Sequence, residues 1–243
     1  ARITEIFSSL QGEGPYMGER HIFIRFESCH MACAYCDETG KNGKEMSLAD
    51  ILTEVVKLEK KSGPHACVSL TGGEPLLEAD FQNVLCPALK QRKFRILLET
   101  SGVLWRQFSK VIGTVDLIAM DLKLSSVTRQ KEFLEEHRKF LKIAKKKEVY
   151  IKVVVSKGVN RREYDEHLRM VAQVAPRTPV FLQPAHVTGR GSPASARRPM
   201  SRGKRVCPEP ALMRLLDKMQ RTGAKILPDV RVGIQLHKLM NIQ

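Results

Sequence analysis

Short apolar segments alternate with helical segments along most of this sequence, and this alternation restricts the fold more than any single residue does. Segments of strand type lie at 3–8, 21–25, 66–70, 94–98, 115–120, 148–155, 180–182 and 225–227. Helices are predicted over 47–60, 80–91, 129–145, 163–175, 212–219 and 233–240. Strands that alternate with helices form a mostly parallel sheet with right-handed crossovers. The predicted fold class is therefore α/β.

Polar or glycine-rich motifs follow the predicted strands directly. They lie at 11–13, in a cysteine loop at 29–36, and at 72–74, 99–101, 121–123 and 183–184. In a closed or partial barrel the carboxyl ends of parallel strands gather on one face. We therefore predict one site assembled from many strand ends, on a partial, modified TIM-like βα barrel of about six or seven units.

The length of 243 residues suits one large domain with a substantial core. We find no internal repeat or linker, so a single domain over 1–243 is expected, with a basic loop insertion at about 185–210. No apolar run approaches the roughly 18 residues that span a bilayer. The N-terminus lacks the basic-then-apolar pattern of a secretory signal. A cytoplasmic protein with no membrane partner is the expectation.

The formal net charge of +15 is compatible with nucleic acid, an acidic partner or a solvated basic surface. The basic run within 190–205 has no aromatic residues that could stack on bases, so nucleic-acid binding is not favoured. A solvated loop is the simplest interpretation. Attraction for an acidic substrate or electron donor comes second.

Three of the six cysteines, Cys29, Cys33 and Cys36, have C-x3-C-x2-C spacing. In a reducing compartment such crowding predicts metal binding rather than disulfides. Zinc needs four ligands, so a zinc site would have to be completed by His21, His30 or another group. A 4Fe–4S cluster on three cysteines leaves one iron open for a small molecule. The remaining cysteines are expected to be ordinary thiols: Cys67, Cys86 and Cys207.

A second motif, Thr71-Gly72-Gly73-Glu74-Pro75, is by itself a strand-ending turn whose glycines allow a close approach to a ligand. Together with the cysteine spacing it resembles the radical S-adenosylmethionine (SAM) superfamily. There the cysteines bind a 4Fe–4S cluster, SAM occupies the fourth iron, and Gly-Gly-Glu-Pro holds the methionine amino group. This resemblance implies that SAM contacts Tyr35, Asp37, Gly73, Glu74, Thr100, Ser101, Asp121, Lys123 and Gln183.

Two further stretches narrow the resemblance to the 7-carboxy-7-deazaguanine synthases. The opening at 5–14, followed by 23–26 and the cysteine loop, is similar to that family, as is the ending at 235–242. The motifs at 99–102, 152–154 and 183–184 fall between them in the expected order. The resemblance covers nearly the whole chain, and 185–210 is its least matched part.

The resemblance implies an enzyme, a radical SAM lyase, that contracts a ring. The reduced cluster would cleave SAM to a 5′-deoxyadenosyl radical, which removes a hydrogen from C6 of 6-carboxy-5,6,7,8-tetrahydropterin. Rearrangement with loss of ammonia gives 7-carboxy-7-deazaguanine, a precursor of queuosine and related 7-deazapurines. The protein would position the reacting atoms and exclude competing reactions. A homodimer is expected, with flavodoxin or ferredoxin as the electron donor.

The matched positions also imply a set of residues for the pterin substrate. Glu13 would accept hydrogen bonds from its guanidine-like edge. Arg25 suits its carboxylate because the planar guanidinium donates two parallel bonds, although without the resemblance a surface ion pair explains this arginine equally well. The full implied set is Leu10, Gln11, Gly12, Glu13, Arg25, Thr71, His237 and the chain end at Gln243.

One position departs from the family pattern. The family typically has Cys-Asp-Thr or Cys-Asp-Ser, whose hydroxyl ligates the Mg2+ that binds the substrate carboxylate. Here Cys36-Asp37 is followed by Glu38 and then Thr39. A carboxylate is a better ligand for a hard cation, so Glu38 is the predicted ligand. A shift that presents Thr39, or an altered dependence on magnesium, is the alternative.

Two other functions fit part of the pattern. Another radical SAM enzyme, such as a glycyl-radical activase, would share the cysteine and Gly-Gly-Glu motifs, but the 11–14 opening and the 235–237 ending favour the deazapurine enzyme. A basic nucleic-acid-binding protein with a structural metal would fit the charge and the cysteines. It leaves the strand-end motifs unexplained.

Overall fold

The computed structural model describes residues 1–36, 38, 40–185 and 209–240. Its sheet has nine strands in the order β3-β1-β2-β4-β5-β6-β7-β8-β9. The strands are β1 Arg2–Leu10, β2 Arg20–Phe26, β3 Lys44–Glu45, β4 Cys67–Gly72, β5 Arg95–Thr100, β6 Leu117–Asp121, β7 Glu148–Val155, β8 Val180–Pro184 and β9 Val230–Val232. β1 pairs antiparallel with β2 and β3. The pairs from β2–β4 to β8–β9 are all parallel.

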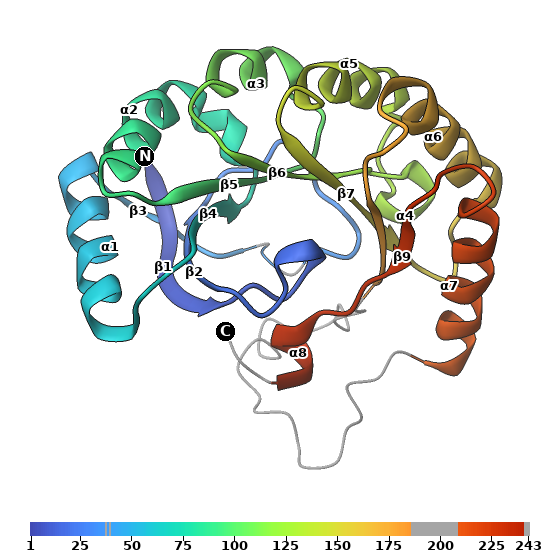
Figure 1. Ribbon diagram of the computed structural model, residues 1–243, viewed down its shortest axis with the longest axis horizontal. Coiled ribbons are helices and arrows are strands. Elements are labelled where there is room, and N and C mark those ends of the chain that lie inside the picture. Colours follow the sequence, from blue (N-terminus) through green and yellow to red (C-terminus); the bar gives the residue numbers. More distant parts are fainter. Residues whose placement is uncertain (37, 39, 186–208, 241–243) are drawn as a thin grey trace.

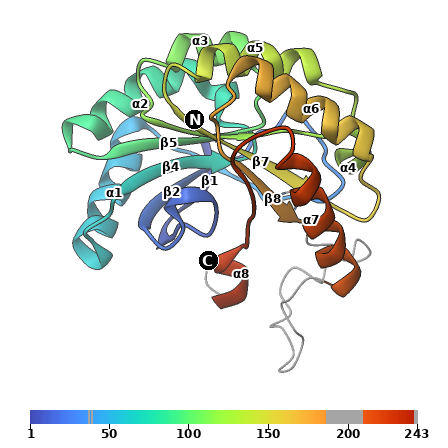
Figure 2. The same ribbon diagram turned by 45° about the vertical axis from the view of Figure 1, so that its right-hand side comes forward.

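The helices cover the outer face of this curved sheet (Figure 1). They are α1 Leu48–Ser62, α2 Ala79–Gln91, α3 Trp105–Val111, α4 Ser125–Thr128, α5 Leu134–Ala144, α6 Arg161–Val174, α7 Pro210–Gly223 and α8 Leu236–Met240, with short 3-10 helices η1 Gly14–Tyr16 and η2 Pro75–Glu78. The arc from α1 to α7 is open on the side where α8 lies, and the turned view agrees (Figure 2). The α/β class and the partial barrel are confirmed.

Local sequence explains where these elements begin. The Ser47 hydroxyl accepts from the backbone N–H of Asp50, and the Asp50 carboxylate accepts from the backbone N–H of Ser47, so a capping box starts α1. β7 is rich in Val and Ile, which suit a strand buried on both faces. Among the described helices, none is long and apolar enough to cross a bilayer.

Alternate side chains of each strand divide the core into two parts. The larger part fills the space between sheet and helices. A smaller cluster lies on the inner face, near the beginnings of the parallel strands, and comprises Cys67, Leu97, Leu117, Ala119, Tyr150 and Phe181. This apolar plug closes the barrel interior below the carboxyl ends of the strands, where the polar motifs lie.

Three predicted elements are wrong in part. The helix expected over 129–145 begins only at Leu134, as α5, because Arg129 adopts a left-handed conformation (φ 58°) at the end of the short preceding helix α4. The strand expected at 225–227 is a turn after α7, where the N–H groups of Ile226 and Leu227 bond to the Gly223 carbonyl. The edge strand is β9 instead. The final helix begins at Leu236 rather than 233.

Besides β9 and the two 3-10 helices, three short elements were not predicted. Helix α3 has seven residues and α4 has four, too few for a clear 3.6-residue periodicity, and β3 has two. The basic insertion expected at about 185–210 lies almost wholly outside the described residues.

Candidate active site

A cavity of about 270 Å³ opens at the carboxyl ends of the parallel strands. Among the predicted site residues it is lined by Leu10, Gln11, Gly12, Glu13, Arg25, Cys29, Cys33, Tyr35, Cys36, Glu38, Thr71, Gly73, Glu74, Thr100, Ser101, Asp121, Lys123 and Gln183. The structure thus brings these residues together around one space. Outside the described part lie Asp37, Thr39, Gln243 and the side chain of His237.

The cysteine loop follows β2 and is anchored to the connection between α4 and α5. The N–H of Ala34 donates to the Thr128 carbonyl at 3.0 Å, and the Gln130 side chain donates to the Ala32 carbonyl at 3.1 Å. Cys33 packs with Met31, Val103 and Phe133 in a small apolar cluster. Burial raises the pKa of the Cys29 and Cys33 thiols.

The arrangement of the thiols bears on the kind of metal. In the described part of the chain, no three His, Cys, Asp or Glu side chains converge closely enough to hold a single ion. Tetrahedral zinc requires such convergence, with each sulfur about 2.3 Å from one ion. An iron–sulfur cluster binds each thiolate through a different iron, and the three thiols line one cavity, which is compatible with such a cluster.

The Gly-Gly-Glu turn after β4 is fitted tightly to the cysteine loop. Gly72 has φ +106°, and a Cβ on Gly73 would lie 2.1 Å from the Ser28 carbonyl oxygen. Glu74 is buried, and its carboxylate accepts from the Thr100 hydroxyl at 2.7 Å and from the Ser101 N–H at 2.8 Å. This glutamate therefore ties the end of β4 to the end of β5.

Lys123 follows β6 and points into the cavity. Its Nζ is 2.7 Å from the Asp121 carboxylate and 3.4 Å from the Tyr35 hydroxyl. Burial opposes its positive charge, but Asp121 and Tyr35 raise its pKa well above the usual value. Burial also raises the pKa of Tyr35 to about 12. The site therefore keeps a cation and a neutral phenol beside the cysteine loop.

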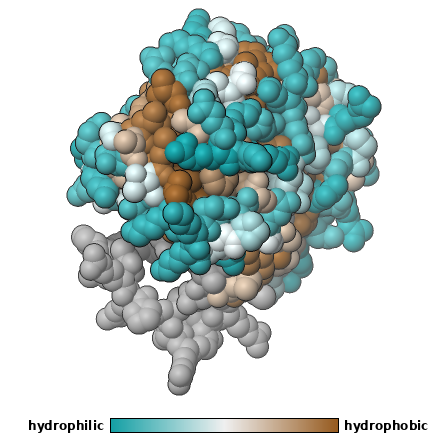
Figure 3. All heavy atoms as spheres, turned by 60° about the vertical axis from the view of Figure 1, so that its left-hand side comes forward, coloured by the Kyte–Doolittle hydropathy of each residue, from teal (hydrophilic) through white to brown (hydrophobic). Residues whose placement is uncertain are grey.

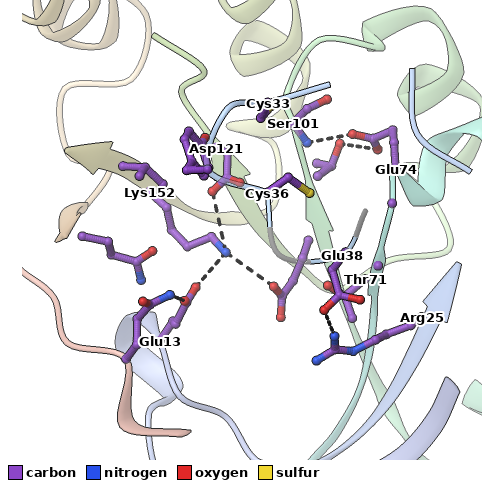
Figure 4. Close-up of a pocket in the computed structure, with 18 of the residues that line it drawn as sticks. Glu13, Arg25, Cys33, Cys36, Glu38, Thr71, Glu74, Ser101, Asp121 and Lys152 are labelled. Atoms are coloured by element: carbon purple, nitrogen blue, oxygen red, sulfur yellow. Dashed lines mark hydrogen bonds and ion pairs between the residues drawn. The ribbon is translucent and has the colours of Figure 1, made fainter. Parts of the chain in front are cut away.

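Arg25 lies at the opposite wall, on β2. Its guanidinium pairs with Glu38, has Nε 3.6 Å from the Glu5 carboxylate, and stacks over the Phe7 ring at 4.9 Å (Figure 4). Glu38 also pairs with Lys41 at 2.8 Å. The predicted carboxylate-binding arginine and the predicted magnesium ligand are thus direct neighbours.

Sequence reasoning did not assign three polar residues that line this cavity: Glu99, Lys152 and Gln235. Lys152 Nζ lies 3.0 Å from Glu13, 3.4 Å from Glu99 and 3.6 Å from Asp121 (Figure 4). Strand alternation carries a signal for both residues: Glu99 is two residues after Leu97 and Lys152 is two residues after Tyr150, so each lies on the same inner face as that apolar cluster, nearer the strand end.

Several buried polar atoms around the cavity make no hydrogen bond within the described protein. They are the Ser101 hydroxyl, Nε2 of Gln183 and Oε1 of Gln235, together with Oδ1 of Asp121 and Nε of Arg25, which have ion-pair contacts at 3.6 Å but no hydrogen bond. Buried polar groups are normally satisfied, so these atoms indicate a polar ligand. They lie at both ends of the cavity, which fits a cofactor of SAM's polarity beside a polar substrate.

Known proteins show the same sequence pattern and fold. The sequence profile of the Radical SAM superfamily matches residues 23–171. The 7-carboxy-7-deazaguanine synthase of Geobacter sulfurreducens is 31% identical over 260 aligned residues, covering 99% of this chain and 97% of that protein. The synthase of Methanocaldococcus jannaschii is 28% identical, with 99% of each chain covered.

Solved structures agree on the fold. QueE from Escherichia coli superimposes with a TM-score of 0.62 at 20% identity, covering 97% of this chain and 94% of that one. Streptococcus suis SuiB bound to S-adenosylmethionine superimposes with a TM-score of 0.58 at 16% identity, covering 86% of this chain and 48% of that one. The chain therefore belongs to the radical SAM superfamily and, within it, to the 7-carboxy-7-deazaguanine synthase family.

Proposed function

We propose that this protein converts 6-carboxy-5,6,7,8-tetrahydropterin to 7-carboxy-7-deazaguanine with loss of ammonia. One observation carries the proposal: a single cavity is lined by the three cysteines and by Glu13 and Arg25, and in the close-up Cys33 and Cys36 lie on one side of it and Glu13 and Arg25 on the other (Figure 4). A SAM-dependent radical enzyme for a pterin carboxylate needs both ends within reach of each other. Family membership over 99% of the chain supports the same reaction.

The cofactors are a 4Fe–4S cluster and SAM, as in the superfamily. When bound, they supply a one-electron cleavage that removes a hydrogen atom from the substrate. We assign the cluster to Cys29, Cys33 and Cys36, which share one loop and line the cavity. The buried Met31, Val103 and Phe133 around Cys33 would keep water from that side of the cluster.

For SAM we assign the strand ends nearest the cysteine loop. The backbone at Gly73 can approach the methionine closely because no side chain intervenes. The Ser101 hydroxyl and Gln183 Nε2 are unpartnered and available to polar groups of the cofactor. The assigned set is Tyr35, Asp37, Gly73, Glu74, Thr100, Ser101, Asp121, Lys123 and Gln183.

For the substrate we assign the opposite end of the cavity. Arg25 would bind the pterin carboxylate through its planar fork, and Glu13 would accept from the guanidine-like edge. Leu10, Gln11 and Gly12 would line the ring from the loop after β1. Thr71, His237 and Gln243 complete the assignment, the last two from the sequence pattern alone.

Magnesium is assigned to Glu38, with Thr39 as the alternative ligand. The chemistry fits: a carboxylate at the wall beside Arg25 is a hard oxygen donor. One of its oxygens pairs with Arg25 and the other meets Lys41, whose side chain is 43% exposed, so a cation bound to the second oxygen would displace that surface lysine. Titrating activity against Mg2+ for wild type and Glu38→Ala tests this. We expect the half-saturating Mg2+ to rise at least tenfold; superimposable curves would remove the assignment.

We also propose a cytoplasmic homodimer that receives electrons from flavodoxin or ferredoxin. The net charge of +15 favours an acidic donor, and the basic segment at about 185–210 is the proposed docking surface. Electrostatic steering weakens with salt. Reduction rates should therefore fall as ionic strength rises, and rates that ignore salt would count against this surface.

The direct test of the reaction is anaerobic reconstitution with iron and sulfide. Reductant, SAM, Mg2+ and the tetrahydropterin are then added, and 7-carboxy-7-deazaguanine is sought by mass. Its formation at many turnovers per enzyme supports the proposal. Robust SAM cleavage without this product would keep the superfamily chemistry and reject the substrate.

A further inference from the structure

Lys152 lines the cavity and has no role in the proposed binding of SAM, substrate or metal. It lies on β7, in register with Asp121 of β6, and only 7% of it is exposed. Its ammonium group meets carboxylates from the loop after β1, from β5 and from β6. Burial works against the charge, but Asp121, Glu13 and Glu99 raise the pKa of Lys152 well above the usual value. The group therefore stays positive.

The contacts of Lys152 continue through both glutamates. The other oxygen of Glu99 accepts from the Gln11 amide at 3.1 Å, and the other oxygen of Glu13 accepts from the Gln235 amide at 2.6 Å. We call this chain of hydrogen bonds and ion pairs, which runs Gln11–Glu99–Lys152–Glu13–Gln235, the carboxylate relay. It joins the loop after β1, the sheet and the segment before α8.

The relay fixes the direction of two carboxylates. Each has both oxygens held by protein donors, which restricts its rotation, and a carboxylate oxygen can accept more than one hydrogen bond. The guanidine-like edge of a pterin presents N–H donors in one plane. Fixed, ionised carboxylates are the acceptors that such an edge requires.

The balance of charges around Lys152 supports the same role in holding the two glutamates. The other oxygen of Asp121 pairs with Lys123 at 2.7 Å, so three carboxylates face two ammonium groups here. Without Lys152 the carboxylates would repel one another, so Glu13 and Glu99 would no longer be held facing the same space.

We propose that Lys152 is a positioning residue for the substrate, which pairs with Glu13 and Glu99 and fixes their direction so that this end of the cavity accepts a planar, donor-rich edge. The SAM end is predicted to be independent of it, because Lys123 holds Asp121 there. This inference rests on the proposed function.

Lys152→Met tests the inference, since methionine removes the charge and keeps much of the length. The matched control is Lys90→Met, which removes an ion pair with Asp116 (2.6 Å) between residues that do not line the cavity. Calorimetry on cluster-loaded protein would measure the affinity for 6-carboxypterin, an oxidised analogue of the substrate, and separately for SAM. Lys152→Met should weaken pterin binding on the order of 30-fold and SAM binding by less than about threefold. Lys90→Met should change neither, and Lys152→Arg should recover part of the loss.

Unchanged pterin affinity in Lys152→Met, or equal losses for pterin and SAM, would overturn the inference. If Lys152→Met does not fold, Gln235→Leu cuts the relay in a half-buried segment and should still weaken pterin binding at least fivefold; no change would again overturn it. Wild-type protein that neither binds 6-carboxypterin nor forms product would reject the proposed function together with the inference. Wild-type protein that does both, beside a Lys152→Met that binds pterin normally, would reject the inference alone.

Discussion

Glu74 shows how a motif residue can act through its neighbours. The family pattern places it beside SAM, and the structure shows that its carboxylate is engaged by the protein: Thr100, Ser101 and the N–H of Leu76, at 3.2 Å. Charge-assisted bonds to buried donors are among the stronger polar contacts. Its contribution to the cofactor site is therefore largely the placement of Thr100 and Ser101.

Replacing Glu74 should affect both folding and cofactor affinity. Glu74→Ala leaves the Ser101 N–H buried without an acceptor, and we expect a loss of about 2–4 kcal/mol in the free energy of unfolding. SAM affinity should fall about tenfold or more, because Ser101 is no longer fixed. Urea unfolding and calorimetry would measure these. The exposed Asp80→Ala on α2 is the control. Equal stability of both variants would contradict the role of Glu74 in joining the end of β4 to the end of β5.

At the scale of elements, the end of β4 and the cysteine loop form one unit. The N–H of Gly73 donates to the Phe26 carbonyl at 2.8 Å, and the N–H of Glu74 donates to the Ser28 carbonyl at 2.7 Å. Ser28 immediately precedes Cys29. The strand end thus sets where the cysteine loop begins, which explains why two distant motifs belong to one site.

A methyl group at Gly73 should displace the cysteine loop. Its Cβ would lie 2.1 Å from the Ser28 oxygen, so the backbone must move, at a cost of about 2 kcal/mol or more. We expect Gly73→Ala to bind less than half as much iron after reconstitution as the wild type. Gly113→Ala, where the added Cβ has no atom within 4 Å, is the control. Full iron content in Gly73→Ala would show that the loop is not fixed by this contact.

Helix α5 supports the same region through His137. Its Nε2 lies 3.2 Å from the Ser101 carbonyl oxygen, and the ring is fully buried beside His167. Burial, and then the neighbouring His167, lower the pKa of His137 to about 3. The folded protein therefore holds this imidazole neutral.

The buried, neutral imidazole of His137 predicts that the folded protein loses stability in mild acid. An unfolded histidine has a pKa of about 6.5, so the unfolded chain binds more protons than the folded one between about pH 6.5 and 3. Above about pH 6.5 the neutral His137 contributes fully to the free energy of unfolding. At pH 5 about 2 kcal/mol of that contribution is lost. Urea unfolding from pH 8 to pH 5 would measure it. His137→Gln should flatten this dependence; an equal slope in the variant would assign the loss to other groups.

For the whole molecule, much of the site was predictable because parallel strands bring their carboxyl ends to one face. Motifs such as Thr71–Pro75 and Glu99–Gly102 could be placed around one cavity from their order alone. Lys152 could not be assigned, because its partners depend on the register of β7 against β6 and on the loop after β1. The separation of α4 from α5 at Arg129 was not predicted, because the spacing of apolar residues does not indicate a residue with positive φ. The prediction of a strand at 225–227 was wrong. Leu227 is apolar because it is buried in the core, and this burial does not require strand pairing.

We infer that one cavity holds SAM and the pterin with their reacting atoms adjacent. The measurement that tests this uses 6-carboxytetrahydropterin deuterated at C6, with mass analysis of both SAM and 5′-deoxyadenosine after turnover. Loss of ammonia alone leaves the product at the oxidation level of the substrate, so the hydrogen atom that is removed must be returned and SAM re-formed. We expect deuterium in the 5′-deoxyadenosyl group, recovered as heavier SAM and heavier 5′-deoxyadenosine, while 7-carboxy-7-deazaguanine is formed. Absence of deuterium from both compounds, beside a normal yield of that product, would rule out this arrangement.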